Sequence, residues 1–161
     1  MTGGGRIGKE SIPGFTSTLA GFIVNTRASD IPVDVFEHAK IAFLDWLGCA
    51  IAGARDPVVE KLIRYADVMG GEAQATIIGR GVQKTVSQAA LINGAASHVL
   101  DYDDTSTGYI GHPSVGMFPA LLALSEWRGM SGREFLTSAV IAYKVASVIG
   151  ACVGKKQYDA G

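Results

Sequence analysis

The chain has 161 residues, with 14 lysines and arginines against 15 aspartates and glutamates, so its formal net charge is -1 at pH 7. Hydrophobic residues make up 48% of the sequence and charged residues only 18%, against about 25% charged residues in ordinary soluble domains. The absence of a basic excess argues against nonspecific nucleic-acid binding, and the apolar fraction excludes disorder over most of the length. The composition therefore predicts one globular domain with an unusual amount of apolar surface to bury.

The cysteines and the N-terminus bear on the cellular compartment. Cys49 and Cys152 are too few for a disulfide-rich scaffold or for an iron–sulfur cluster held by several thiolates. Residues 1–14 are polar and rich in glycine and lack the apolar core of a signal peptide. We therefore expect a flexible N-terminal tail over residues 1–14, a domain over residues 15–161, and a reducing, cytoplasmic location.

The most apolar stretch covers residues 135–154, which is long enough to span a bilayer. Lys144 lies in the middle of this stretch, where a charge costs about 3 kcal/mol on membrane-insertion scales. Thr137, Ser138 and Ser147 add further polarity. We therefore expect a helix buried within protein and no membrane association.

The spacing of apolar residues predicts helices along nearly the whole chain. The expected fold class is all-α, a helical bundle-like domain with at most one short strand. The first helix is predicted over residues 15–26. Asp30 is expected to cap a second helix that has Pro32 in its first turn and ends at Gly53.

The middle of the chain carries further boundary signals. A third helix is predicted to begin at Asp56, just before a proline, and to end at Gly70. Residues 75–79 form the only strand-like run. A helix rich in small residues is then expected from residue 86 to about residue 104.

The last two helices are marked by a proline and by a capping motif. Pro119 conflicts with a straight helix over residues 114–128, so we expect either a kink or a late start there. Ser131 and Glu134 have the spacing of a capping box, in which each side chain satisfies a backbone N–H of the other residue. A long helix is predicted to follow, up to about residue 153.

Chemically useful side chains are concentrated in residues 98–113, which read HVLDYDDTSTGYIGHP. If the preceding helix continues through this segment, His98, Asp101 and Thr105 lie on one face of it. His112 precedes a proline and is biased towards an extended conformation. A carboxylate, a hydroxyl and an imidazole can then converge where the helix end meets a loop, and such a group suits proton transfer and the binding of an anionic substrate.

Each of these residues also has a simpler interpretation. Asp103 and Asp104 can be a solvated helix end, and His98 can be a buried histidine that bonds a backbone carbonyl. The clustered aspartates can also bind magnesium through their oxygens. However, no second acidic motif occurs downstream to complete a two-motif magnesium site.

The same segment resembles the MmgE/PrpD family, whose members include 2-methylcitrate dehydratase, cis-aconitate decarboxylase and iminodisuccinate epimerase. The resemblance covers residues 15–154. It rests on HVLDYDDT at 98–105, GHPS at 111–114, FPALLAL at 118–124, LDWLG at 44–48 and ATIIG at 75–79.

The resemblance implies a helical domain, a smaller α+β lid domain inserted later in the chain, and a homodimer. It also implies a cofactor-independent lyase without a metal, which acts on small di- or tricarboxylates. In such an enzyme a proton moves at a carbon next to a carboxylate or carbonyl, coupled to loss of water, loss of carbon dioxide or epimerisation.

The resemblance also assigns roles to individual residues. Asp101, Thr105 and His112 match the family's active-site Asp, Thr and His, with His98 and Asp104 in supporting positions. His112 is the best candidate for carrying a proton. Asp101 would orient an imidazole or hydroxyl, and Thr105 would donate a hydrogen bond to a substrate carboxylate.

The chain also departs from the family pattern. Family members are much longer, and their second active-site histidine and their lid lysine have no counterpart in this sequence. Lys144 stands where relatives commonly carry a glutamate. We therefore expect the isolated chain to be an incomplete, inactive helical domain without the lid, with large exposed apolar patches. A non-catalytic fragment or association subunit is the main alternative, and a metal-dependent all-α enzyme is a third.

Overall fold

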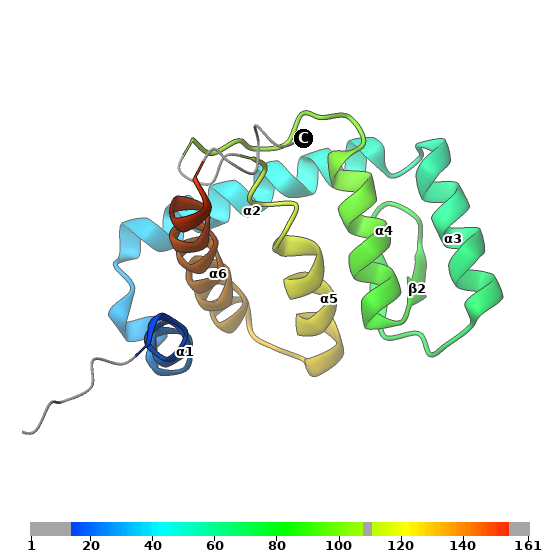
Figure 1. The fold of residues 1–161 in the computed structure, drawn as a ribbon. Helices are drawn as coiled ribbons and strands as arrows, with labels where there is room; N and C mark the ends of the chain where they lie inside the picture. The colour runs from blue at the N-terminus through cyan, green and yellow to red at the C-terminus, as the bar shows by residue number, and fades with distance from the viewer. Residues whose placement is uncertain (1–13, 108–110, 155–161) are drawn as a thin grey trace, which may run out of the picture.

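The computed structural model describes residues 14–107 and 111–154, and the predicted N-terminal tail lies outside this part except for Gly14. The described residues form six α-helices, one 3-10 helix and a two-stranded antiparallel sheet (Figure 1). The prediction of a mostly helical domain is confirmed. The elements are α1 (Phe15–Asn25), η1 (Ala28–Asp30), α2 (Val33–Gly53), α3 (Pro57–Met69), β1 (Ala75–Ile77), β2 (Val82–Lys84), α4 (Val86–His98), α5 (Phe118–Arg128) and α6 (Gly132–Val153).

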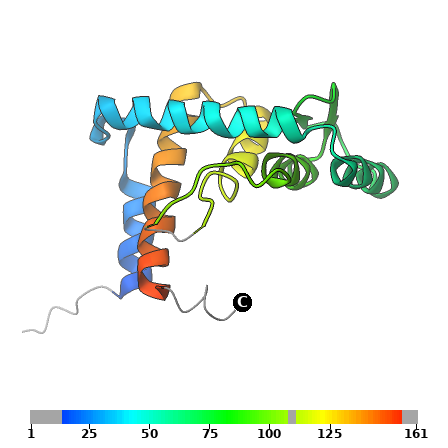
Figure 2. The same ribbon diagram turned by 90° about the horizontal axis from the view of Figure 1, so that it is seen from above.

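The long helix α2 runs across α4 and α6, and α4 packs against α5 (Figures 1 and 2). Gly53, at the end of α2, allows a close approach to α4. A Cβ atom at this position would collide with the Ala96 carbonyl oxygen and lie 2.7 Å from Val99 Cγ1. The last turns of α2 and α4 therefore meet at the place where the motif-bearing segment begins.

Two clusters of buried side chains hold the helices together. The first joins α3, α4, α5 and the sheet around Val59, Ile77 and Ile92, each at most 1% exposed. The second joins α2, α5 and α6 around Trp46 and Phe118, which are fully buried. Together they form the core on which the loop between α4 and α5 is supported.

The small sheet is attached to α4 by a buried asparagine. Asn93 accepts a hydrogen bond from the Ile78 N–H at 2.9 Å and donates one to the Thr76 carbonyl at 2.9 Å. The predicted run at 75–79 is a strand only over its first three residues. The second strand, Val82–Lys84, was missed because it is short, with two polar residues and mostly exposed side chains.

Most of the predicted helix starts are confirmed. Asp56 caps α3 by accepting a 2.8 Å hydrogen bond from the Val58 N–H. Ser131 and Glu134 form the expected capping box at the start of α6. The helix around Pro119 has a late start rather than a kink, because it begins at Phe118 and places the proline in its first turn.

The predicted cap of α2 is wrong. Asp30 closes the 3-10 helix and accepts a 2.8 Å hydrogen bond from the Arg27 N–H. Pro32 itself is the residue before α2, so Asp30 lies two residues too early to reach the free N–H groups of the first turn.

The predicted length of α4 is also wrong, because the helix ends at His98 instead of near residue 104. Asp101 has a φ of 48°, in the left-handed region. Aspartate tolerates this conformation and favours local side-chain hydrogen bonds over helix. The carboxylates that follow bond to residues of the returning loop, and these contacts replace further helical turns.

Helix α6 is less buried than expected. It is long and apolar enough to cross a membrane by length and composition, a test that core helices of soluble proteins also pass. Only 11% of its most apolar window is buried within the structure. Phe135, Ala139 and Gly150 are its buried residues, and most of the others are half-buried. Its exposed large apolar side chains are Ile149 and Val153, near its C-terminal end.

Candidate active site

The loop between α4 and α5 returns to the end of α4 through an isolated antiparallel bridge. The Ser106 N–H donates a 2.9 Å hydrogen bond to the Gly111 carbonyl. Residues 108–110 lie outside the described residues. The bridge places His112 beside the aspartates that follow α4.

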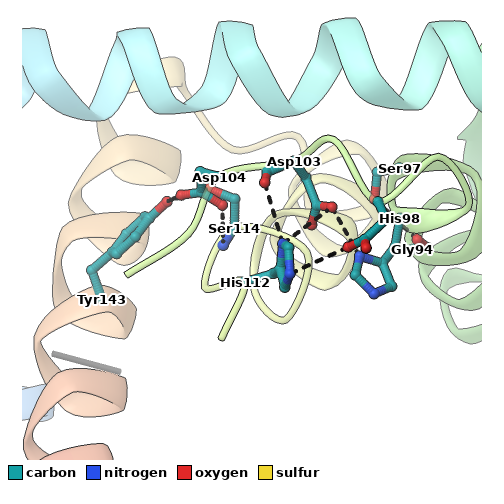
Figure 3. A network of polar contacts seen from close by, with 9 residues as sticks. Gly94, Ser97, His98, Asp103, Asp104, His112, Ser114 and Tyr143 are labelled. Carbon is teal, nitrogen blue, oxygen red and sulfur yellow. Dashed lines mark hydrogen bonds and ion pairs between the residues drawn. The ribbon is translucent and has the colours of Figure 1, made fainter. Parts of the chain in front are cut away.

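His112 lies between Asp101 and Asp103, and Figure 3 shows the side facing Asp103. Its Nδ1 is 3.2 Å from the Asp103 carbonyl oxygen and 3.3 Å from Asp103 Oδ1. Its Nε2 is 3.4 Å from Asp101 Oδ1. The Asp101 side chain is 79% exposed and that of His112 is 26% exposed, so one edge of the ring faces the interior and the other faces the solvent side.

Asp103 also contacts the second histidine of the segment. Its Oδ1 lies 2.8 Å from His98 Nδ1, and its side chain is fully buried. The interpretation of Asp103 as a solvated helix end is therefore wrong. The alternative for His98 is wrong as well, because the ring is 46% exposed and bonds a carboxylate instead of a backbone carbonyl. The His98 and His112 rings lie edge to face, with their centroids 4.8 Å apart.

Asp104 belongs to a second group of polar contacts, which links the loop to α6 (Figure 3). Its carboxylate accepts hydrogen bonds from the Ser114 N–H at 3.1 Å, from the Ser114 hydroxyl at 2.8 Å and from the Tyr143 hydroxyl at 3.0 Å. The two hydroxyls also contact each other. Asp104 is half-buried, so it too is not a solvated helix end. Burial, and then the negative charge of Asp104, raise the pKa of Tyr143 above its ordinary value of 10.0.

Thr105 does not join the histidines. It is exposed, and among the residues that the structure describes it forms no hydrogen bond with Asp101 or His112. The predicted single face of His98, Asp101 and Thr105 required α4 to continue, and the helix ends before it can form. The structure thus brings the imidazole and the carboxylates together and leaves the hydroxyl at the edge of the group.

The same cluster has the donor set of a cation site. One ligand atom each from His98, Asp101, Asp103 and His112 lies within 4.8 Å of the others. Imidazole and carboxylate donors of this kind suit zinc or another first-row transition ion. The described geometry equally suits proton transfer, because an imidazole flanked by carboxylates can take up and release a proton.

Sequence reasoning left three residues of this site without a role. Asp103 could be recognised only as one of several clustered aspartates, because its burial depends on the two histidines that enclose it. Ser114 lies inside the GHPS motif, which gave a signal for the motif but not for the contact. Tyr143 lies 39 residues after Asp104 in sequence, and no local pattern indicates that pairing.

The chain is similar to one protein-family model and to several curated proteins. The model of the MmgE/PrpD N-terminal domain matches residues 17–160. Among curated relatives, a cis-aconitate decarboxylase of Aspergillus terreus is 29% identical over 87% of this chain. A cis-aconitate decarboxylase-like protein of Aspergillus oryzae is 26% identical over 86% of the chain.

A third relative, the cis-aconitate decarboxylase of mouse, is 31% identical over 69% of the chain. The chain spans about 30% of the length of the two Aspergillus proteins and 23% of the mouse protein. The family model covers most of the chain, including every residue of the loop site. The chain belongs to the MmgE/PrpD family.

Proposed function

We propose that this protein provides one wall of the active site of a cofactor-independent lyase acting on small di- or tricarboxylates. The reaction moves a proton at a carbon next to a carboxylate and couples this transfer to loss of carbon dioxide or water. Family membership and the names of the relatives support this reaction class. Decarboxylation of cis-aconitate is the first reaction to test.

The observation that carries the proposal is the placement of His112. Its Nδ1 edge is held by Asp103, while its Nε2 edge lies beside the exposed carboxylate of Asp101. A ring held in this way presents one nitrogen for proton transfer at the solvent side. In the proposed reaction His112 carries the proton, Asp101 shares it at Nε2, and Thr105 donates a hydrogen bond to a substrate carboxylate.

The exposure of the site defines what else the reaction requires. The side chains of Asp101 and His98 are 79% and 46% exposed, and water at such a surface weakens the electrostatic stabilisation of a charged transition state. Turnover therefore needs a cover over this wall and a further cation for the anionic substrate. Both would come from protein segments outside the described residues or from a second copy.

The test measures proton transfer at carbon directly. The complete gene product is incubated in deuterated water with cis-aconitate, 2-methylcitrate or iminodisuccinate, and deuterium incorporation and product formation are followed by NMR. His112→Ala is expected to lower turnover by about 10²- to 10⁴-fold, the usual contribution of a general acid or base. The matched control His38→Ala changes a histidine of α2 whose ring contacts the Asp34 carbonyl instead of the loop aspartates.

The same experiment separates the proposal from its main alternative. An association subunit without catalysis is favoured by one observation, the absence of buried residues in α1. Unchanged turnover in His112→Ala would remove the assigned role of this residue. No turnover or exchange of any of the three acids by the wild-type protein would favour the association subunit.

A further inference from the structure

The buried carboxylate of Asp103 contacts both histidines of the site. Asp103 Oδ1 lies 2.8 Å from His98 Nδ1 and 3.3 Å from His112 Nδ1, and the side chain is inaccessible to solvent (Figure 3). We propose that Asp103 is the positioning residue of this site, which sets the orientation and the tautomer of both imidazoles. Its effect on catalysis rests on the proposed role of His112 as proton carrier, whereas its effect on the rings does not.

The contacts determine where the ring protons lie. An ionised carboxylate only accepts hydrogen bonds, so each Nδ1 that faces it carries a hydrogen. For His112 the backbone carbonyl of Asp103 is a second acceptor, 3.2 Å from the same nitrogen. Both neutral rings are therefore Nδ1–H tautomers, and each has its lone pair on Nε2. A second proton on His112 can add only at Nε2, beside Asp101.

The backbone holds Asp103 firmly enough for this role. On one side, Asp101 turns the chain out of α4 with its positive φ of 48°. On the other side, Asp104 is bonded to Ser114 and Tyr143. Asp103 thus lies between the turn at Asp101 and the hydrogen-bonded Asp104, and this placement keeps its side chain in the interior.

The second oxygen of the carboxylate indicates that stability alone does not explain this arrangement. Asp103 Oδ2 is buried and has no hydrogen-bond partner among the described residues. Burying a carboxylate oxygen without a partner is costly, and such groups in native proteins call for an explanation. Two imidazoles held by the other oxygen of the same carboxylate provide that explanation.

The chain is well suited to a direct test, because it contains only three histidines. His38 is an internal reference, since its Nδ1 lies 2.9 Å from the Asp34 carbonyl oxygen in α2 and this contact does not involve Asp103. Two-bond ¹⁵N–¹H correlation spectra of the imidazoles, recorded where the rings are neutral, identify each tautomer. In the wild-type protein all three rings are expected to be Nδ1–H tautomers.

Asp103→Ala removes the shared acceptor. His98 is expected to move towards the Nε2–H tautomer, His112 to shift less because it keeps the backbone carbonyl, and His38 to stay unchanged. In the turnover assay kcat is expected to fall by about 10- to 1000-fold with KM within about threefold, because the proton carrier is misaligned while substrate contacts remain. Asp67→Ala is the matched control, since it removes an aspartate that pairs with Lys84 outside the site.

Two results would overturn the proposal. One is a wild-type spectrum with His98 or His112 in the Nε2–H form, which decides the matter even if Asp103→Ala does not fold. The other is a folded Asp103→Ala protein in which both rings keep their wild-type tautomers. Lack of turnover by the wild-type protein contradicts the proposed function alone, because the tautomers are read without any substrate.

Discussion

The hydroxyl of Tyr143 in α6 donates a 3.0 Å hydrogen bond to Asp104 Oδ2 in the loop that follows α4. The same carboxylate holds the backbone and side chain of Ser114, two residues after His112. The Asp104 carboxylate thus links the part of the loop that contains Ser114 to α6 through hydrogen bonds. Loss of these hydrogen bonds is expected to make His112 less well ordered and to lower the free energy of unfolding.

Tyr143→Phe tests the hydrogen bond between Tyr143 and Asp104 through the stability of the protein and its pH dependence. The variant loses hydrogen bonds to a hydroxyl and to a carboxylate at a half-buried position, so the free energy of unfolding should fall by about 1–2 kcal/mol at neutral pH. Chemical denaturation monitored by circular dichroism measures this loss. An unchanged midpoint and slope would show that the contact contributes nothing.

The dependence of the free energy of unfolding on alkaline pH also follows from the contacts of Tyr143. The pKa of Tyr143 is raised in the folded protein, first by burial and then by the charge of Asp104. The unfolded chain therefore releases this proton first, and the stabilisation is complete below about pH 10 and is lost as the pH rises through the folded pKa. Tyr143→Phe should flatten this decline, and an equally steep decline in the variant would assign it to other groups.

Gly53→Ala tests the close approach of α2 and α4. The new Cβ would meet the Ala96 carbonyl oxygen and Val99 Cγ1, so helices must move apart at a cost of about 1–3 kcal/mol or more. Gly48→Ala is the matched control, because this glycine lies in the same helix with no atom within 4 Å of a new Cβ. It should be stabilising by up to about 1 kcal/mol. Equal melting temperatures for the two variants would contradict this packing.

The apolar outer face of α2 should make the chain self-associate. Ile41, Leu44 and Ile51 are 65%, 69% and 57% exposed and lie on one stripe of the helix. Apolar patches of this kind are uncommon on monomeric proteins. Light scattering should give a mass above the 16.8 kDa of one chain. Replacing all three by glutamine should reduce association, while Val68→Gln on α3 should not. A monodisperse wild-type monomer would refute the expectation.

Chelation tests whether the cluster of His98, Asp101, Asp103 and His112 works through hydrogen bonds or through a cation. The short contact between Asp103 Oδ1 and His98 Nδ1 has the 2.8 Å length of a charge-assisted hydrogen bond. Turnover of cis-aconitate should therefore survive incubation with EDTA. Loss of turnover that added zinc or magnesium restores would identify a metal site and remove the cofactor-independent mechanism.

Much of the helical framework could be predicted from the sequence because its signals are local. Asp56 and Ser131 mark helix starts through hydrogen bonds to residues only two or three positions away. Gly53 ends α2 as predicted. Where the local signal was ambiguous, as at Asp30 near Pro32, the predicted cap was wrong by two residues.

The end of α4 shows why the site itself was harder to predict. Helical spacing aligned His98, Asp101 and Thr105, yet the chain leaves the helix at His98. The decisive contacts join Asp103 to His112 and Asp104 to Ser114, nine and ten residues apart. Such contacts depend on how the loop returns, and a periodic pattern carries no information about that return.

The sequence by itself determined the fold class, the order of the helices, the family and the segment in which the polar side chains of the candidate site lie. All of these depend on residue types and short spacings. Only the tertiary structure decided that Asp103 is buried between two imidazoles and that Asp104 bonds Tyr143 of α6. The free energy of a buried carboxylate depends on the groups that surround it, and those groups are brought together only when the loop packs against the helices.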